Sequence, residues 1–347
     1  MEERILEILK TLVAMKSVTC SETEQEPAKW FADFFREMPY FKEHPELTGL
    51  YEIPQDPYGR KIPYALLLGK KKDTVVFSGH FDVVSTEEYG KAEAWAYEPG
   101  QKLEEMLAQM HLDDATRADL ESGEWIWGRG VADMKGGLAL HAALFEEYAK
   151  QAAEGALEGS ILFMPVCDEE SYSTGMRKGI SIIKDMKEKY GLDYKLLIDP
   201  EPTNEVDGAQ VMSLGSVGKV MPAIIVQGKK GHAGHCYEGF SALGIISDIY
   251  QRTNGSLQFS DVYEDEATVP PTWANMRDMK KGYDVSIPHR AYGYFTVLTF
   301  DSTPESTIDK LRKICTDAFE NQVRKLDGEY QEYKKINKAE RKEKIYY

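Results

Sequence analysis

Residues 74–82 read Thr-Val-Val-Phe-Ser-Gly-His-Phe-Asp, and residues 161–170 read Ile-Leu-Phe-Met-Pro-Val-Cys-Asp-Glu-Glu. Each stretch opens with an apolar run without polar alternation, which is typical of strands buried on both faces of a parallel sheet. Two further strand-like runs lie at 65–68 and 195–198, and helical patterns lie at 2–15, 25–38, 137–151 and 175–190. Strands that alternate with helices predict an α/β fold, with a mostly parallel sheet flanked by helices.

The pattern changes after about residue 213. Two strand-like segments (219–226 and 291–300) and two helical segments (240–252 and 305–323) follow, with a polar, proline-rich connection in the middle. These segments predict a small α+β domain inserted after the fourth strand of the first domain. We therefore expect domains at 1–214 and 215–330, and a charged helical tail at 331–347.

Composition and charge argue against several classes of protein. The 347 residues are 42% hydrophobic and 29% charged, a globular composition. The formal net charge of −16 disfavours nucleic acid and anionic membranes as partners, because phosphate groups need a basic surface. No apolar stretch approaches the ~20 residues that span a bilayer, and the start of the chain does not read as a secretory signal. The four cysteines form no C-x-x-C pair, so we expect a cytoplasmic protein without disulfides: Cys20, Cys167, Cys236 and Cys315.

His80 and Asp82 stand at the end of the first buried run. Residues i and i+2 of a strand project to the same face. His80 can therefore bind a metal while Asp82 accepts a hydrogen bond from the other ring nitrogen. The alternative is a plain hydrogen-bonded pair near a strand end.

Asp133 lies in a glycine-dense turn, Gly-Arg-Gly-Val-Ala-Asp-Met-Lys-Gly-Gly at 128–137, which opens a helix. Glycines there permit close approach of neighbouring chain. The turn is not a dinucleotide fingerprint, because Asp133 occupies the third glycine position and would repel a pyrophosphate. Asp133 is either a metal ligand or the N-cap of the helix.

Two more acidic clusters follow strand-like runs, at 168–170 (Asp-Glu-Glu) and 199–203 (Asp-Pro-Glu-Pro-Thr). Adjacent carboxylates resist joint ionisation unless a cation is present. The alternative for 168–170 is a solvated acidic loop, and the alternative for 199–203 is an ordinary turn. Open α/β sheets place their ligand sites at the carboxyl ends of strands. One histidine and several carboxylates there form a donor set suited to zinc.

Five motifs occur in order: GHFD at 79–82, GRGVADMKGG at 128–137, DEE at 168–170, EPT at 201–203 and GKKGHAG at 228–234. With them the sequence resembles the M20 metallohydrolases, which include aminoacylases, deacylases and zinc exopeptidases. The insert between Ser85 and Trp127 and the run DEESYSTGM at 168–176 resemble the arginine-utilisation branch. The resemblance implies a zinc-exopeptidase-like catalytic domain with an inserted lid, and a zinc-dependent hydrolase of amide or peptide bonds in small amino-acid derivatives.

The resemblance also implies the metal ligands. A complete site holds two zinc ions. His80 and Glu201 would bind one of the two zinc ions, and Glu170 would bind the other. Asp133 would bridge the two.

Further roles follow from the same resemblance. Asp82 would orient His80, and Glu169 would be the general base that takes a proton from the attacking water and passes it to the leaving nitrogen. His232, in the lid, would contact the substrate; the alternatives are a surface histidine or the neighbouring His235 in its place. The partners implied are a small amino-acid derivative or peptide and, through the lid, a second copy of the chain.

The chain departs from the family pattern at two places. Ser171–Thr174 precede Gly175, where the family usually has a glycine soon after the paired glutamates, which indicates a different pocket wall. No histidine follows His289, although the resemblance implies a final zinc ligand beyond the lid. We therefore expect a C-terminally truncated chain that lacks the rest of its catalytic domain; the alternatives are a half-built site and a site that another chain completes. The alternative function is a metal-binding fragment that is catalytically incomplete.

Overall fold

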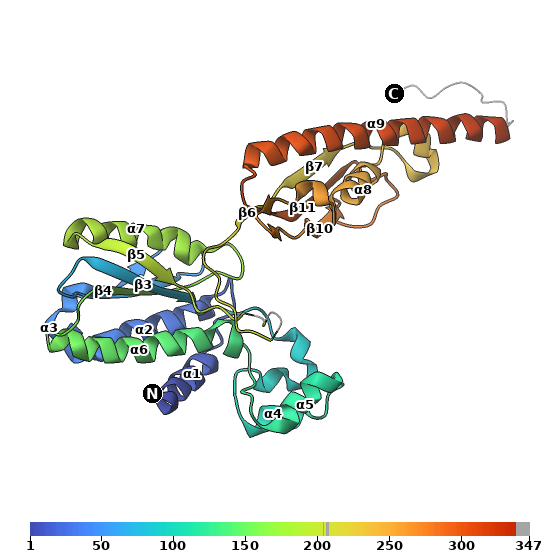
Figure 1. Ribbon diagram of the computed structural model, residues 1–347. Helices are drawn as coiled ribbons and strands as arrows, with labels where there is room; N and C mark the ends of the chain where they lie inside the picture. The colour runs from blue at the N-terminus through green and yellow to red at the C-terminus, as the bar shows by residue number, and fades with distance from the viewer. Residues whose placement is uncertain (204, 206–207, 338–347) are drawn as a thin grey trace. The chain divides into compact units, whose positions relative to one another are not determined.

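The structure is a computed structural model that describes residues 1–203, 205 and 208–337 (Figure 1). The chain divides into two units, Met1–Val211 and Met212 onward. The division falls three residues before the predicted boundary at 214. Each unit has its own hydrophobic core.

The first unit is built on a five-stranded sheet in the order β1-β2-β4-β3-β5. The strands are β1 (Thr48–Glu52), β2 (Lys61–Leu67), β3 (Asp73–His80), β4 (Ser160–Val166) and β5 (Asp193–Ile198). β3 pairs with β4 and with β5 in parallel, whereas β2 pairs antiparallel with both β1 and β4. All strands except β2 therefore point the same way, and the predicted α/β fold with a mostly parallel sheet is confirmed.

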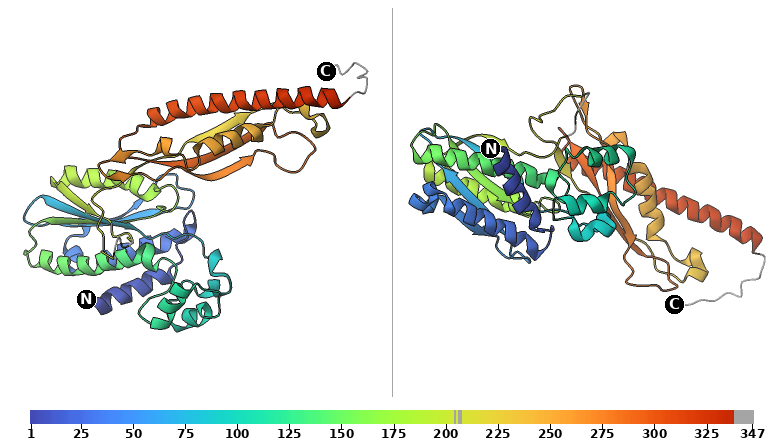
Figure 2. Two further views of the ribbon diagram at one scale, coloured as in Figure 1. Left: turned by 45° about the vertical axis from the view of Figure 1, so that its right-hand side comes forward. Right: turned by 90° about the horizontal axis from the view of Figure 1, so that it is seen from below.

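Helices cover both faces of this sheet (Figures 1 and 2). One face carries α1 (Glu2–Ala14), α2 (Gln25–Glu37), α3 (Pro39–Glu43) and α6 (Gly136–Ala153), and the other carries α7 (Thr174–Tyr190). The bounds of α1, α2, α6 and α7 agree with the predicted helices to within two residues, whereas α3 was not predicted. The segment between β3 and α6 adds α4 (Gln101–Leu107) and α5 (Asp114–Ser122), which have a small apolar cluster of their own.

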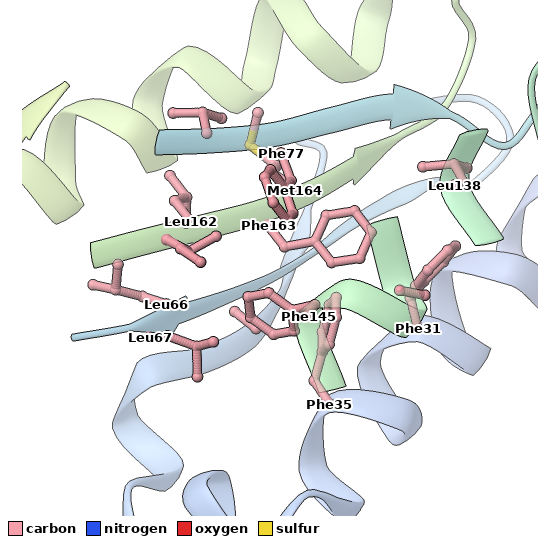
Figure 3. Packing of buried hydrophobic residues seen from close by; sticks show 14 of the residues in the cluster. Phe31, Phe35, Leu66, Leu67, Phe77, Leu138, Phe145, Leu162, Phe163 and Met164 are labelled. Carbon is pink, nitrogen blue, oxygen red and sulfur yellow. The ribbon is translucent and has the colours of Figure 1, made fainter. Parts of the chain in front are cut away.

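Aromatic side chains fill the space between β4 and the helices (Figure 3). The Phe163 ring lies 5.7 Å from Phe31, 5.4 Å from Phe35 and 5.4 Å from Phe145, measured between centroids. Phe31 and Phe35 come from α2 and Phe145 from α6, so one ring of the sheet ties both helices to it. The contacts with Phe31 and Phe35 are edge-to-face and that with Phe145 is tilted, and such aromatic pairs add to the free energy gained from burying the rings. This rigid core supports the strand ends described below.

The second unit pairs β11 (Arg290–Thr299) with β10 (Thr272–Asp278) on one side and with β6 (Gly218–Val220) and β7 (Ala223–Gln227) on the other. All pairings are antiparallel. A two-stranded ribbon, β8 (Val262–Tyr263) and β9 (Glu266–Ala267), lies apart from this sheet. The helices α8 (Ala242–Thr253) and α9 (Pro304–Ile336) pack with the sheet around one apolar cluster.

Two predicted features of this unit were wrong, and one strand was not predicted. The single strand at 219–226 is two strands, since Met221 and Pro222 interrupt it and proline has no N–H for a ladder. The polar, proline-rich connection contains β10, for which no strand was predicted. The helix expected at 305–323 continues to Ile336, so residues 331–336 belong to α9 and not to a separate tail; 338–347 lie outside the described residues.

Charge is distributed unevenly between the units. Acidic residues clearly outnumber basic ones in residues 1–211, whereas the two kinds nearly balance from 212 to 347. The net charge of −16 therefore belongs almost wholly to the first unit. Within the part of the chain that the structure describes, no helix is long and apolar enough to cross a membrane.

Candidate metal centre

The candidate site lies where three parallel strands end. β3 ends at His80, β4 is followed by Cys167–Glu170, and β5 is followed by Asp199–Glu201. In the parallel register His80 lies beside Val166 of β4, and Phe77 lies beside Ile198 of β5. The three loops therefore leave the same edge of the sheet, as predicted for the motifs at strand ends.

His80 is the centre of this edge. Its side chain is 1% exposed, and its Nε2 atom lies 2.9 Å from Asp133 Oδ1, 3.4 Å from Glu201 Oε1 and 3.9 Å from Glu169 Oε2. The ligand atoms of His80, Asp133 and Glu201 all lie within 4.8 Å of one another. Three of the predicted metal ligands thus converge. Glu170, the fourth, is not part of this group of described residues, and its role stays a prediction.

The protonation of His80 reflects its acidic surroundings. Burial favours the neutral ring, but hydrogen bonds with Asp133, Asp82 and Glu201 outweigh it and raise the pKa of His80 to about 12. The same bond to His80 lowers the pKa of Asp133. The ring therefore carries a positive charge among carboxylates when no other cation is near.

Asp82 is buried and contacts both His80 and the acidic turn. His80 Nδ1 lies 2.9 Å from the Asp82 backbone oxygen and 3.5 Å from its carboxylate. The carboxylate also accepts hydrogen bonds from the backbone N–H groups of Glu169, at 3.0 Å, and Glu170, at 3.2 Å. The contact between Asp82 and His80 was predicted from the sequence. The hydrogen bonds from the backbone of Glu169 and Glu170 were not, because a backbone donor does not depend on the type of side chain.

Two glycines of the motifs bring the loops together. A Cβ at Gly79 would lie 2.6 Å from Met134 Cε, so its absence lets the residue after Asp133 pack against the end of β3. A Cβ at Gly137 would lie 2.3 Å from the Pro200 carbonyl oxygen, so its absence lets the Glu201 loop rest on the start of α6. Close backbone approach is a recurrent use of glycine.

The paired glutamates are half-buried. Burial raises the pKa of Glu169, and its acidic neighbours Glu201 and Asp82 add to the rise. Burial also raises the pKa of Glu170, to which the charge of Asp133 contributes. Both carboxyls thus hold a proton at a higher pH than an exposed glutamate does.

A cavity of about 190 Å³ adjoins the site. Its walls include His80, Glu169 and Glu201, and also Ser173, Met176 and Asp199. The last three carried no predicted role, although Ser173 lies in the stretch that the sequence marked as an altered pocket wall. Arg129 was also missed: its charge acts on Asp133 and Glu170, and its guanidinium lies over the Tyr89 ring at 5.3 Å.

His232, predicted to contact the substrate, belongs to the second unit. It is exposed, and its Nδ1 accepts a hydrogen bond from the Gly234 N–H at 3.0 Å. Its ring centroid lies 5.9 Å from that of His235. His235 in turn approaches Glu238, with 3.6 Å between Nδ1 and Oε1. Neither histidine is tied to a substrate role by these contacts, and the choice between them stays open.

The residues at the strand ends fit a divalent cation. A buried imidazole nitrogen faces Asp133, Glu201 and Glu169, and a further carboxyl, Glu170, follows in the turn. One nitrogen and several carboxylate oxygens are the donors found in zinc sites with an open position. The crowded carboxyls, whose pKa values rise at Glu169 and Glu170, gain from a positive charge among them.

Comparison with known proteins agrees with this geometry. A profile described as Peptidase family M20/M25/M40 matches residues 76–336, from the middle of β3 to the end of α9. The chain belongs to this peptidase family. As an M20 family member it includes every motif quoted above within the matched range, as the sequence resemblance predicted.

Curated M20 relatives extend beyond the length of this chain. "Uncharacterized protein YqjN" of Bacillus subtilis is 31% identical over 98% of this chain and 62% of its own length. "Protein RocB" of the same organism is 29% identical over 96% of this chain and 59% of its own length. The chain thus spans about three fifths of the length of these two relatives. A solved M20 family metallo-carboxypeptidase of Sulfolobus solfataricus, at 14% identity, covers 90% of this chain with a TM-score of 0.61, which shows a shared fold; 75% of that chain is covered.

Proposed function

We propose that the protein is a zinc-dependent hydrolase of amide or peptide bonds in small amino-acid derivatives. The observation that carries the proposal is the buried His80 imidazole, whose Nε2 faces Asp133, Glu201 and Glu169 within 3.9 Å. Membership of a peptidase family agrees with it. Several carboxylates crowded around one imidazole nitrogen gain from a bound divalent cation, which supports a metal site.

The proposed metal ligands are His80, Asp133 and Glu201, with Glu170 as the ligand of a second ion. Zinc bound there supplies Lewis acidity, which polarises a carbonyl and lowers the pKa of water towards ~7. Asp82 fixes the ring of His80 through its backbone oxygen and carboxylate. It thereby sets which ring nitrogen is free to bind a metal.

Glu169 is the proposed general base. Its carboxylate lies beside His80 Nε2, with 3.9 Å between the atoms, and on the wall of the cavity. In this role it takes a proton from the attacking water and delivers it to the leaving nitrogen. A positioned base of this kind typically contributes roughly 10²- to 10⁴-fold to the rate.

The substrate class rests on the relatives. Several matching proteins are called succinyl-diaminopimelate desuccinylase, among them one from Hahella chejuensis that is 29% identical over 53% of this chain and 42% of its own length. That name describes removal of an acyl group from an amino acid, and it supports N-acyl amino acids or dipeptides as substrates here. The similarity to RocB supports the predicted arginine-utilisation branch. His232 is the proposed substrate contact from the second unit.

The test is a hydrolysis assay on the purified chain with a panel of N-acetyl amino acids, arginine and alanine derivatives included, and of dipeptides. Amine release is measured before and after treatment with a chelator and after addition of zinc, and metal content is measured by elemental analysis. Chelator-sensitive release that zinc restores supports the proposal. Bound zinc without release from any compound would instead support a metal-binding function without turnover.

The variant Glu169→Gln separates the base from the metal ligands. We expect kcat to fall by roughly 10²- to 10⁴-fold, the contribution of a positioned base, while metal content stays at the level of the unchanged protein. Glu188→Gln on α7 is the control, since this exposed glutamate pairs only with Lys184 among described residues. Normal turnover in Glu169→Gln would remove Glu169 from the mechanism.

A further inference from the structure

The turn that carries Glu169 and Glu170 is held by two backbone hydrogen bonds, Ser173 N–H to Asp168 O and Gly175 N–H to Cys167 O, and by carboxylate acceptors from distant parts of the chain. The Asp168 N–H donates to Glu24 Oε2 at 2.8 Å, and the next two N–H groups donate to the Asp82 carboxylate. Asp168 itself has φ of 64°, a left-handed conformation that aspartate tolerates better than most residues. Since the turn is not part of a strand or helix, its shape depends on these acceptors.

The Asp168 carboxylate points into a buried ion-pair network and not towards His80. Its Oδ1 atom lies 2.6 Å from Arg60 Nη1, and its Oδ2 accepts a hydrogen bond from the Thr174 N–H at 3.1 Å. Its side chain is fully buried. With both oxygens engaged, Asp168 ties the turn to Arg60 and to the start of α7, while Glu169 lies beside His80 and on the cavity wall.

Arg60 joins the anchoring groups. Its guanidinium lies 2.6 Å from Asp56, 3.3 Å from Glu24 and 2.6 Å from Asp168, measured between nitrogen and oxygen atoms, and its side chain is only 5% exposed. The planar fork of arginine can bond several carboxylates at once, which the single ammonium of lysine does less well. Removing this cation would leave three carboxylates facing one another without a buried counter-ion.

We infer that Arg60 and Glu24 are positioning residues, which hold the Asp168–Glu170 turn so that Glu169 faces His80. Arg60 lies in the loop between β1 and β2, and Glu24 lies in the short helical turn before α2, so both are remote in sequence from the turn. Neither touches the reacting groups. Their effect passes through Asp168, as is common for residues behind a metal site.

The first test measures amide hydrogen exchange by mass spectrometry in the Arg60→Ala variant. We expect the segment 168–174 to exchange at least about tenfold faster than in the unchanged protein, because the N–H groups of Asp168, Glu169, Glu170 and Thr174 donate to carboxylates that lose alignment. The control is Arg4→Ala, which removes a two-bond ion pair with Glu146, at 2.9 and 2.7 Å, that makes no contact with the turn. Equal protection of 168–174 in both variants would overturn the inference.

The second test is kinetic and is the only part that rests on the proposed function. In Arg60→Ala we expect kcat to fall about 10²-fold with KM changed by only a few-fold, because small misplacements of catalytic groups cost rate. Guanidinium ion, at concentrations far below denaturing ones, should enter the space left by the side chain and restore part of kcat. An unchanged kcat in a folded Arg60→Ala variant, or a loss equal to that in Arg4→Ala, contradicts the inference.

A milder variant keeps the test decisive if Arg60→Ala does not fold. Asp168→Asn preserves size and tolerates the left-handed backbone, but replaces one accepting oxygen with an amide that faces a donor. Faster exchange of residues 168–174 is expected here too, and unchanged exchange counts against the inference. Faster exchange in a chain that hydrolyses no test compound would uphold the positioning role and reject the proposed hydrolase.

Discussion

His141 on α6 is a buried ring that must stay neutral. It stacks on Phe77, with 4.3 Å between ring centroids and 9° between planes, and it is 2% exposed. Burial lowers its pKa to about 4, because the charged ring would lose its hydration. Its Nδ1 atom has no hydrogen-bond partner among the described residues. The fold therefore binds a proton at His141 less readily than the unfolded chain does.

This difference predicts a pH-dependent contribution to stability. The pKa of His141 lies below that of an unfolded histidine, so the contribution is complete above about pH 6.5 and is lost as the pH falls through about 4. It amounts to about 3 kcal/mol at most, from ~1.4 kcal/mol per pKa unit. The His141→Leu variant should show a flatter dependence of unfolding free energy on pH in this range, measured by urea denaturation. Parallel curves for both proteins would refute the assignment.

Single residues also show where sequence reasoning stops. His80, Asp133 and Glu201 could be predicted because each follows or opens an element with a strong pattern, and parallel strands bring such positions to one edge. The two hydrogen bonds that the Asp82 carboxylate accepts from backbone N–H groups could not be predicted, because every residue except proline carries such a group. Arg60 could not either, because its surroundings, Asp-Pro-Tyr-Gly-Arg-Lys at 56–61, read as an ordinary turn.

The contact between α6 and the loop after β5 is the feature that places Glu201. Gly137→Ala adds a Cβ that would lie 2.3 Å from the Pro200 carbonyl oxygen, so the loop must shift. We expect zinc affinity to fall by about 10- to 100-fold, the usual effect of disturbing groups around a metal ligand. Affinity is measured by competition with a chromogenic chelator.

A matched glycine provides the control for this substitution. Gly328 lies within α9, and a Cβ there meets nothing within 4 Å. Gly328→Ala should therefore leave zinc affinity unchanged and stabilise the helix by about 0.5–1 kcal/mol. Unchanged zinc affinity in Gly137→Ala would show that Glu201 does not depend on this contact.

The elements differ in how well their patterns predict them. In the first unit, continuous apolar runs and strong 3.6-residue periodicity predicted β3, β4, β5 and the four longest helices, because burial on both faces or on one stripe leaves a clear pattern. β1 was missed because it is only partly buried, and the start of β2 was missed by four residues. β10 was missed because its residues alternate between partly buried and exposed, and because prolines precede it. The length of α9 was missed since its second half buries little and therefore shows no apolar stripe.

For the whole molecule, we predict a homodimer formed through the second unit. β7 pairs with β11 on one side, and among described residues no strand pairs with its other side. Ile225 in β7 is 73% exposed, which is unusual for a large apolar side chain on a strand edge. Sedimentation should give twice the mass of the chain, and Ile225→Glu should give a monomer with its melting temperature unchanged. A monomeric parent protein would contradict the prediction.

The uneven charge of the two units has a kinetic consequence. Because the excess of acidic residues lies in the unit that carries His80, the electric field around that unit draws cations inward before any contact forms. Divalent ions and positively charged small molecules would arrive more often than diffusion alone allows, and anions less often. Added salt shortens the reach of this field to about 10 Å at 0.1 M, so capture would slow while the residues that hold the ion stay the same.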